Sequence, residues 1–331
     1  FTIDEKVEIL LSSDTPVGIC KSIGLGLIGL GEAYDRLKPD IVLIMGDRFE
    51  AFAAASAALV LRIPIAHLYG GEATFGAMDE AIRHSITKMS HFHFTSTEKY
   101  RKRVIQLGEN PERVFNVGAV GLDNIKRLKL LSKKALEKEL NFKFNKHNLL
   151  VTFHPVTLEN NTSKQQFRSL LNVLDTLKDT NIIFTYANAD THGRILNTMI
   201  EQYIDKRRHK SVAFSTMGQL KYLSTMQFVN AVVGNSSSAI VETPSFKIGT
   251  INIGDRQKGR IKPESVIDCQ PKEGSIRKAF KEIYSKKFQE NLKNVKSPFD
   301  RGVMASLKIK EIVKNISLDG VLKKEFYDIC S

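Results

Sequence analysis

The chain has 331 residues, 42% hydrophobic and 26% charged, a composition typical of globular proteins and neither disordered nor membrane-like. Its formal net charge of +13 favours an anionic partner, either a phosphorylated small molecule or a nucleic acid. The cysteines Cys20, Cys269 and Cys330 have no metal-binding or redox spacing. No apolar run is predicted to reach the roughly 18 residues that span a bilayer, so we expect a cytoplasmic protein without a membrane partner.

The basic runs at 126–134 and 206–210 contain no interleaved aromatic residues and no nucleic-acid-binding motif. We therefore interpret them as solvated surface and expect no nucleic acid partner.

The amino-terminal region gives one strand signal and one helix signal. Val7–Leu11 reads as a strand, and Thr15 followed by Pro16 predicts the start of a helix. That helix contains a G-x-G-x-x-G spacing from Gly24 to Gly29, which is the fingerprint of dinucleotide binding. No strand runs directly into Gly24, so these glycines are predicted to serve close helix packing instead.

Two acidic residues follow predicted strands. The apolar runs 41–45 and 63–68 read as buried parallel strands, and each continues into glycine and then into Asp47 or Glu72. Ligands bind at the carboxyl edge of open parallel sheets, so these carboxylates are expected to share one crevice. Neighbouring carboxylates shift each other's pKa, as acid and base pairs require.

The next predicted helix, over 79–90, begins with Asp79 and Glu80. These acids lie four residues before Arg83 and His84 respectively, so each pair is expected on one helix face. The simpler interpretation is favourable acidic placement in the first helical turn, with an ordinary ion pair to Arg83.

Alternating strand and helix signals predict an α/β fold with two Rossmann-like domains built on parallel sheets. We expect a first domain over 1–143, a second over 144–300, and a segment 301–331 whose helix returns to the first domain. The remaining predicted elements are helices 49–61, 98–107 and 304–316 and strands 92–95, 114–117, 149–153, 182–186 and 228–233.

The second half also places polar residues after strands. His154 ends one strand, where its ring is expected to be exposed, although a core or capping histidine is an open alternative. Asn235, Ser236 and Ser237 follow another strand and open a helix, an arrangement that suits phosphate but also resembles a simple serine N-cap. Glu242 could hydrogen-bond a ribose diol. Arg256 and Arg260 offer guanidinium donors to a diphosphate.

Taken together, these segments resemble one enzyme family over nearly the whole chain. The motifs are G-D-R-F-E, G-G-E-A-T-F-G-A-M-D-E-A-I-R-H-S-I-T-K-M-S-H, H-P-V-T, G-N-S-S-S-A-I-V-E and I-N-I-G-D-R-Q-K-G-R. In this order they closely resemble the hydrolysing UDP-N-acetylglucosamine 2-epimerases of bacterial sialic-acid synthesis. The resemblance implies a glycosyltransferase-B-like fold with the active site in the cleft between the domains. It further implies conversion of UDP-N-acetylglucosamine and water into N-acetylmannosamine and UDP, without a cofactor or an obligatory metal.

The resemblance also implies roles for individual residues. Catalytic positions of the family fall on Asp47, Glu72, Asp79, Glu80, Arg83 and His154. The UDP side is expected at Asn235, Ser236 and Ser237 of the G-N-S-S-S turn and at Glu242 and Arg256. Family members begin with a G-T/S-R-A-E-Y-G loop that this sequence does not contain, and Tyr69 stands where the family often has histidine.

The implied chemistry gives a mechanistic hypothesis. The proton on sugar carbon 2 is not acidified by a carbonyl, so departure of UDP must build oxocarbenium character first. Arg83, His154, Arg256 and the serine helix would stabilise the diphosphate. A carboxylate among Asp47, Glu72 and Asp79 would remove the proton to give a glycal, and another would return a proton while water adds.

Several alternatives stay open at this point. The same chemistry could act on a UDP- or GDP-linked 2,4-diacetamido-2,4,6-trideoxy sugar on the route to legionaminic acid. A non-hydrolysing 2-epimerase and a non-catalytic protein that binds a sugar nucleotide or RNA are the other candidates. In each enzyme interpretation the partner is a nucleotide sugar, and a homo-oligomer, dimer or tetramer, is expected.

Overall fold

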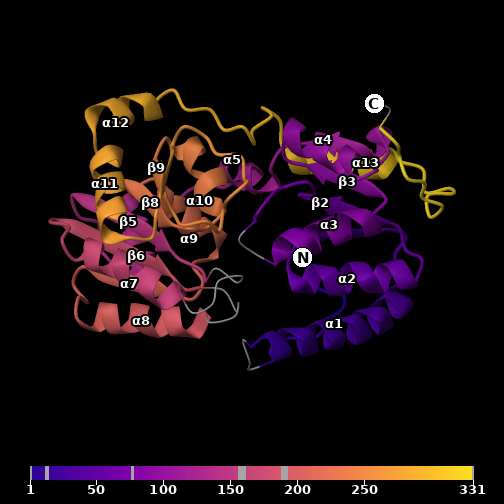
Figure 1. Ribbon diagram of the computed structural model, residues 1–331, viewed down its shortest axis with the longest axis horizontal. Coiled ribbons are helices and arrows are strands. Elements are labelled where there is room, and N and C mark those ends of the chain that lie inside the picture. The colour runs from indigo at the N-terminus through magenta and orange to yellow at the C-terminus, as the bar shows by residue number, and fades with distance from the viewer. Residues whose placement is uncertain (1, 12–14, 76–77, 156–161, 188–192, 330–331) are drawn as a thin grey trace. The chain divides into compact units, whose positions relative to one another are not determined.

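The structure is a computed structural model that describes residues 2–11, 15–75, 78–155, 162–187 and 193–329 (Figure 1). The chain forms two compact units, each described here by itself. Unit 1 comprises Phe1–Thr74, Met78–Val120 and Phe299–Ser331, and unit 2 comprises Phe75–Ala77 and Gly121–Pro298. Unit 2 thus begins earlier than the expected boundary at 143/144. Leu136 and Leu140 pack in one cluster with Leu150, so the Lys-rich segment before 144 belongs to the core of unit 2.

Unit 1 contains a fully parallel sheet in the order β1-β2-β3-β4. Short turns of 3-10 helix, Pro111–Arg113 and Val120–Leu122, flank its last strand. Its helices and strands are α1 (Pro16–Leu37), β1 (Val42–Met45), α2 (Phe49–Val60), β2 (Ile65–Leu68), α3 (Asp79–Met89), β3 (Phe92–Thr95), α4 (Glu98–Gln106), β4 (Val114–Asn116) and α13 (Ala305–Asn315).

Both faces of the unit 1 sheet are covered, because successive side chains of a strand point to opposite faces. Ile65 of β2 packs in a cluster with Ala55 and Ala58 of α2 and Ile86 of α3. The next residues, Ala66 and Leu68, lie in a separate cluster that includes Ala305 and Ile309 of α13. The late helix α13 is therefore part of the core of unit 1.

Unit 2 contains a second parallel sheet, in the order β10-β9-β8-β5-β6-β7. The sequence prediction missed its edge strands β7 and β10 and the strand β9. Its elements are α5 (Asp123–Arg127), α6 (Lys133–Leu140), β5 (His147–Thr152), α7 (Ser163–Leu174), β6 (Thr180–Thr185), α8 (Gly193–Asp205), β7 (Ser211–Phe214), α9 (Gly218–Met226), β8 (Ala231–Gly234), α10 (Ser238–Val241), the 3-10 turn η3 (Thr243–Phe246), β9 (Gly249–Ile253), β10 (Val266–Cys269), α11 (Glu273–Ile283) and α12 (Lys286–Leu292).

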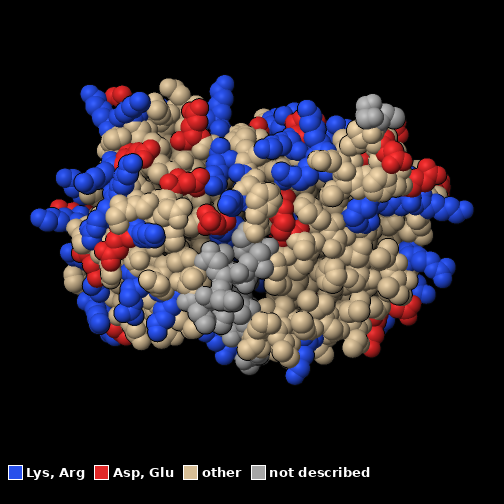
Figure 2. Space-filling model, viewed as in Figure 1, with Lys and Arg blue, Asp and Glu red and all other residues tan. Residues whose placement is uncertain are grey.

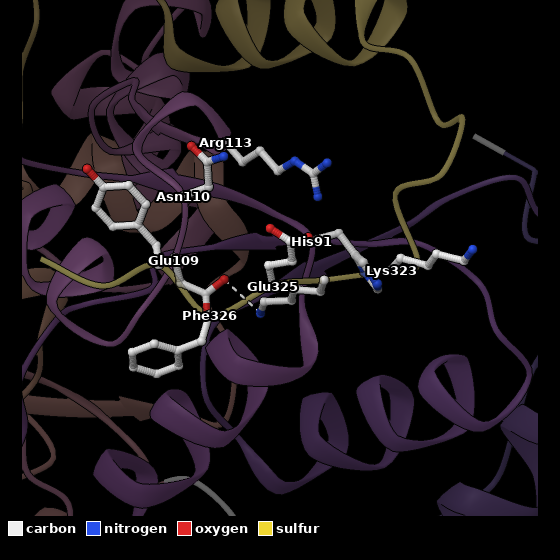
Figure 3. A pocket seen from close by; sticks show the side chains of 9 residues that line it. His91, Glu109, Asn110, Arg113, Lys323, Glu325 and Phe326 are labelled. Atoms are coloured by element: carbon white, nitrogen blue, oxygen red, sulfur yellow. Dashed lines mark ion pairs between the residues drawn. The ribbon is translucent and has the colours of Figure 1, made fainter.

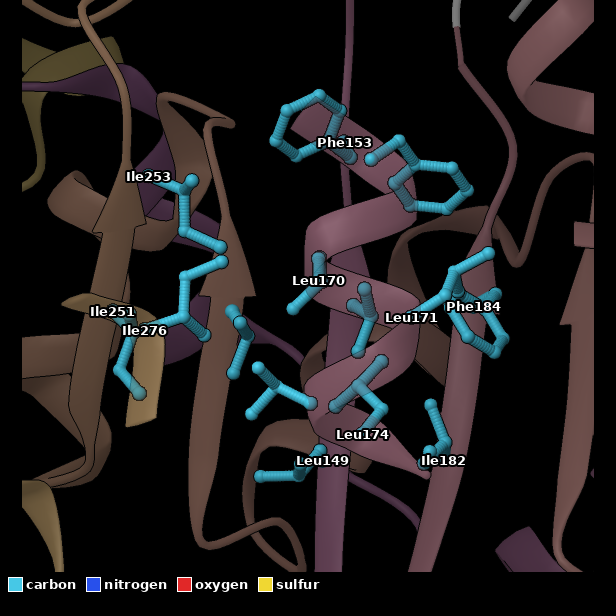
Figure 4. Packing of buried hydrophobic residues seen from close by; sticks show 14 of the residues in the cluster. Leu149, Phe153, Leu170, Leu171, Leu174, Ile182, Phe184, Ile251, Ile253 and Ile276 are labelled. Atoms are coloured by element: carbon cyan, nitrogen blue, oxygen red, sulfur yellow. The ribbon is translucent and has the colours of Figure 1, made fainter. Parts of the chain in front are cut away.

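The larger core of unit 2 lies on one face of this sheet. Figure 4 shows Leu149 of β5 and Phe153, which directly follows β5, packed against Leu170 and Leu174 of α7. Leu150, between them in sequence, faces the other cluster. The sheet is thus doubly wound, and the expected α/β class with two parallel sheets is confirmed.

The predicted strand Val7–Leu11 is wrong, since residues 2–11 form no strand. Val7 and Ile9 pack instead against Gly29 and Gly26 of α1, where a Cβ would come within 2.5 Å and 3.5 Å of them. The helix start is confirmed, because the Thr15 hydroxyl accepts a hydrogen bond from the backbone N–H of Gly18 and Pro16 is the first helical residue.

Among the described residues, α1 is long and apolar enough to cross a membrane by length and composition. The sequence analysis did not single out this helix, because Lys21 and Glu32 interrupt its apolar run. The helix packs along α2, with Gly26 against Ala53, so part of its apolar surface belongs to the core. On the face of the molecule drawn in Figure 2, Lys and Arg side chains are interspersed with Asp and Glu.

Candidate active site

The first group of site residues follows the carboxyl ends of the strands in the unit 1 sheet. Met45 pairs with Leu68, and Leu68 with Phe94, so the turns after β1, β2 and β3 begin side by side. Gly46 and Gly71 have φ values of +82° and +76°, and a Cβ on Gly71 would lie 2.4 Å from the Tyr100 carbonyl oxygen. Only glycine fits there without strain, which explains the glycine before each acid.

Arg83 of α3 joins these turns and is 0% exposed. Its Nε donates to Asp47 Oδ2 at 2.8 Å, and one terminal nitrogen donates to Asp47 and, at 2.7 Å, to the Thr74 hydroxyl. The other terminal nitrogen donates to Glu80 Oε2 at 2.6 Å and to the Glu72 carbonyl oxygen at 3.0 Å. All five guanidinium N–H donors are thereby used.

The electrostatics of this network hold Arg83 charged. Burial alone lowers its pKa, but Asp47, Glu72 and Glu80 more than offset that effect and raise the pKa above the ordinary value. Because every donor is occupied by protein groups, the hypothesis that Arg83 stabilises a departing diphosphate does not fit this geometry. Arg83 is better described as the residue that orients the acids.

Both carboxylate oxygens of Glu80 have polar partners. Its Oε2 accepts from the Thr74 backbone N–H at 2.6 Å as well as from Arg83, and its Oε1 lies 3.2 Å from His84 Nε2. Burial raises its pKa, but the hydrogen bonds from His84 and Thr74 and the charge of Arg83 bring it down to about 2. The predicted pairing of Glu80 with His84 is confirmed. Such a carboxylate is unsuited to exchange protons near neutral pH.

Glu72 and Asp79 complete the acidic group. Glu72 is 5% exposed, and its Oε1 accepts from the hydroxyl of Ser96 at 2.8 Å. Asp79 is partly exposed in the first turn of α3. Ser96 follows β3 at the same sheet edge, so the strand-end rule that selected Asp47 could also have found Ser96.

His67 of β2 was not anticipated as a site residue. Its Nε2 donates to the Gly46 carbonyl oxygen at 2.8 Å, and its Nδ1 lies 3.2 Å from the hydroxyl of Thr87. Burial lowers its pKa to about 4, so the ring is neutral and donates through Nε2. His67 therefore fixes the turn that carries Asp47. A histidine inside an otherwise apolar strand was the available signal.

The second group of site residues follows the carboxyl ends of strands in the unit 2 sheet. Gly234 has φ +137°, and a Cβ there would lie 1.8 Å from the Thr152 carbonyl oxygen, so the ends of the paired strands β8 and β5 are in close contact. The Asn235 side chain accepts from the His154 backbone N–H at 2.7 Å and donates to the His154 carbonyl oxygen at 2.8 Å. Asn235 thus fixes the turn of His154. His154 is only 6% exposed, so the expectation of an exposed residue is wrong.

The serines of the unit 2 turn present hydroxyl groups. Ser236 Oγ lies 3.0 Å from Ser238 Oγ, which lies 2.6 Å from the hydroxyl of Tyr222. Ser237 makes no side-chain capping bond, which argues against the simple N-cap interpretation. The helix α10 has only four residues, so its dipole contributes less than the sequence suggested. Tyr222, on α9, was not predicted.

Glu242 and Arg256 lie in the same unit. Burial raises the pKa of Glu242 to about 8, and its buried Oε2 has no hydrogen-bond partner among the described residues. Arg256 donates to the Asn235 carbonyl oxygen at 3.3 Å, and Gln257 donates to the same oxygen at 2.9 Å. The turn Asn235–Ser237 is therefore held from both sides. Within the described part of the chain, no group of three or more His, Cys, Asp or Glu side chains is arranged to hold a metal ion.

Comparison with known proteins identifies the family. The family model described as UDP-N-acetylglucosamine 2-epimerase matches residues 1–314. The chain belongs to this family. A Campylobacter jejuni relative, "GDP/UDP-N,N'-diacetylbacillosamine 2-epimerase (hydrolyzing)", is 46% identical over 99% of this chain and 85% of its own length.

Two further relatives are less similar. The Escherichia coli "Polysialic acid biosynthesis protein P7" is 36% identical over 99% of this chain and 84% of its own length. The Legionella pneumophila "UDP-N,N'-diacetylbacillosamine 2-epimerase (hydrolyzing)" is 35% identical over 86% of this chain and 75% of its own length.

The fold is shared with solved members of the family. The structure of the Neisseria meningitidis UDP-GlcNAc 2-epimerase bound to UDP-GlcNAc matches with a TM-score of 0.74 and 18% identity, covering 92% of this chain and 84% of that one. The fold is therefore glycosyltransferase-B-like, as the resemblance implied.

Proposed function

We propose that this family member is a hydrolysing 2-epimerase whose substrate is UDP- or GDP-linked N,N'-diacetylbacillosamine, a 2,4-diacetamido-2,4,6-trideoxy sugar. The observation that carries this proposal is the 46% identity, over nearly the whole chain, to a relative that bears this name. The Legionella relative has a corresponding name. This reverses the order of preference drawn from the sequence, which favoured UDP-N-acetylglucosamine.

The geometry supports an elimination and hydration sequence. In the first step the bond between sugar carbon 1 and the diphosphate oxygen breaks and the nucleoside diphosphate leaves. The proton on carbon 2 passes to a carboxylate, which leaves a glycal with a double bond between carbons 1 and 2. In the second step a carboxylic acid protonates carbon 2 from the opposite face and water adds to carbon 1. The products are the free 2-epimeric sugar and the nucleoside diphosphate.

The proton carriers in this proposal are among Asp47, Glu72 and Asp79. We exclude Glu80 from proton transfer because both of its oxygens are bound and its pKa is about 2. Arg83 holds Asp47 and Glu80 in place, and His67 holds the turn of Asp47. These residues act through the acids and are positioning residues.

The nucleotide side of the proposed site lies in unit 2. Ser236 and Ser237 offer hydroxyl donors to a phosphate, and Arg256 adds a guanidinium beside the same turn. The unpartnered oxygen of Glu242 suits a hydroxyl of the ribose diol. A cytoplasmic location and a homo-oligomeric state remain predictions.

The test is a parallel turnover assay in deuterated water. The full chain is incubated with UDP- and GDP-N,N'-diacetylbacillosamine and with UDP-N-acetylglucosamine, and the products are followed by NMR. We expect free nucleoside diphosphate and a 2-epimeric trideoxy sugar carrying deuterium on carbon 2. Turnover of UDP-N-acetylglucosamine alone would overturn the proposed substrate. Product without deuterium on carbon 2 would overturn the elimination sequence.

A further inference from the structure

A separate cavity of about 300 Å³ lies at the amino end of β3, the sheet edge opposite to the acids (Figure 3). His91, directly before β3, lines it together with residues 323–327 of the carboxyl-terminal segment. That segment is anchored by the Tyr327 backbone N–H, which donates to the Gly108 carbonyl oxygen at 2.9 Å. The cavity is built from His91, Glu109, Asn110, Arg113, Lys323 and Phe326, among others.

One of the two acidic residues that line this cavity, Glu109, is already neutralised. Glu109 is 2% exposed and accepts from Lys88 Nζ and Lys324 Nζ, each at 2.7 Å, and from His93 Nε2 at 2.9 Å. The Nζ of Lys324 also donates to the backbone carbonyl oxygens of Lys88 and Ser90. Glu109 therefore has little capacity left to attract a cation.

The other polar groups that line the cavity are one further carboxylate, the exposed Glu325, and several hydrogen-bond donors. His91 is 5% exposed, and its Nδ1 accepts from the Ile65 backbone N–H at 3.1 Å, which leaves the proton of the neutral ring on Nε2. Burial and the nearby cations Lys324 and Arg113 lower the pKa of His91 to about 4, so the ring remains neutral. His91 lines the cavity, and its Nε2–H group has no hydrogen-bond partner among the described residues.

Two cationic side chains complete this donor set. The Arg113 guanidinium lies 5.9 Å from the centre of the Phe92 ring, and among the described residues it forms no hydrogen bond or ion pair. Lys323 is exposed and lines the same cavity without an ion pair within the described ranges. Figure 3 shows both side chains extending on the side of the cavity where His91 lies. A planar guanidinium with free donors matches a carboxylate or phosphate.

We propose that this cavity binds the anionic group, carboxylate or phosphate, of a small sugar acid or sugar phosphate, held by Arg113, Lys323 and His91 Nε2–H. The volume suits a ligand of about monosaccharide size, since ligand cavities begin at roughly 300 Å³. The ring of Phe326 supplies an apolar wall. The site is distinct from the acids of unit 1, which leave the opposite edge of the sheet, and it does not depend on the proposed function.

The binding test uses three sugars with the same pyranose ring that differ in the substituent at carbon 6. Glucose 6-phosphate, glucuronate and neutral glucose are titrated into the full chain by isothermal calorimetry, and thermal unfolding is measured in parallel. We expect at least one of the anionic sugars to bind below about 10 mM and glucose not to bind. A phosphate preference and a carboxylate preference are distinguished by which of the two anionic sugars binds more tightly.

Variants of the lining residues test whether the anionic sugar binds in this cavity. Arg113→Gln and Lys323→Gln are each expected to weaken the anionic sugar by about tenfold, the effect of losing one charge-assisted contact. Arg208→Gln is the matched control, because Arg208 is 79% exposed and lies in unit 2, and it should leave the affinity unchanged. Because Lys323 is exposed, its variant tests the proposal even if Arg113→Gln fails to fold. Absence of binding by both anionic sugars, or equal binding by wild type and both variants, would overturn the proposal.

Discussion

Replacement of Arg83 is the strongest test of how the acids are organised. Arg83 is 0% exposed and donates to Asp47, Glu80, Thr74 and the Glu72 carbonyl oxygen. Arg83→Lys retains the charge but offers three donors in place of five. The variant therefore loses two of the hydrogen bonds that the charged side chain donates. At about 1.5 kcal/mol each, this predicts a loss of about 3 kcal/mol in the free energy of unfolding.

Removal of the charge should cost more. Arg83→Met leaves Asp47 and Glu80 without their cation, and breaking a buried ion pair costs roughly 3–5 kcal/mol. The Asp47 and Glu80 side chains are 23% and 22% exposed, so water compensates part of this cost and we expect about 4 kcal/mol. Adding Asp47→Asn and Glu80→Gln to Arg83→Met should then recover at least about 1 kcal/mol of the free energy of unfolding. Unlike the carboxylates, the neutral amides leave no unpaired charge at the site.

The assay is equilibrium urea unfolding, with turnover of the nucleotide sugar as a second readout. For turnover, a positioning role predicts that Arg83→Lys lowers kcat by about 100-fold with a small change in KM, as for a misplacement of about 1 Å. The control Arg208→Lys, on a side chain that is 79% exposed, should change stability by less than about 0.5 kcal/mol. If Arg83→Met cost less than about 1 kcal/mol, the acids would not depend on Arg83 and the reasoning would be refuted.

Three further outcomes are expected. The pKa of Glu80 is lowered to about 2, so its ionised form stabilises the protein above pH 4.5 and this contribution is lost as pH falls towards 2; Glu80→Gln should flatten that acid limb in urea unfolding. The pKa of Glu242 is raised to about 8, so ionisation destabilises the fold increasingly from about pH 4.5 to 8; Glu242→Gln should remove that decline, measured as unfolding midpoints at pH 5 and 9. Gly71→Ala should cost about 2 kcal/mol or more in thermal unfolding because the new Cβ would lie 2.4 Å from the Tyr100 carbonyl oxygen, whereas Gly31→Ala in open helix should be neutral or stabilising by up to about 1 kcal/mol.

Local signals predicted the local structure well. Strand 92–95 and the start of α1 at Pro16 lie where the sequence placed them, because an apolar run and a Thr-Pro cap are complete within a few residues. The Val7–Leu11 strand failed because its alternating apolar residues also fit against a helix, and Val7 packs on Gly29. Strands β7 and β10 at the edges of the unit 2 sheet have partly exposed residues and a weak apolar pattern.

The sequence indicated which residues lie at the sheet edges but not which of them contact one another. The acids at strand ends could be found because parallel strands expose their carboxyl ends together. The role of Arg83 could not, since it depends on Asp47, which lies 36 residues earlier in the chain and meets Arg83 only through the sheet. His67 and Tyr222 were missed for the same reason, because each acts through a hydrogen bond to a distant turn or helix.

The two units solve one physical problem in different ways. Each must present polar groups from a sheet edge without leaving the turn free to move. Unit 1 uses a buried cation, Arg83, and this keeps several carboxylates together that would otherwise repel one another. Unit 2 uses a neutral amide, Asn235, which fixes the turn of His154 without adding charge. The proton-transfer acids and the anion-binding turn that the proposed reaction needs thus differ in their supports as well as in their reactive groups.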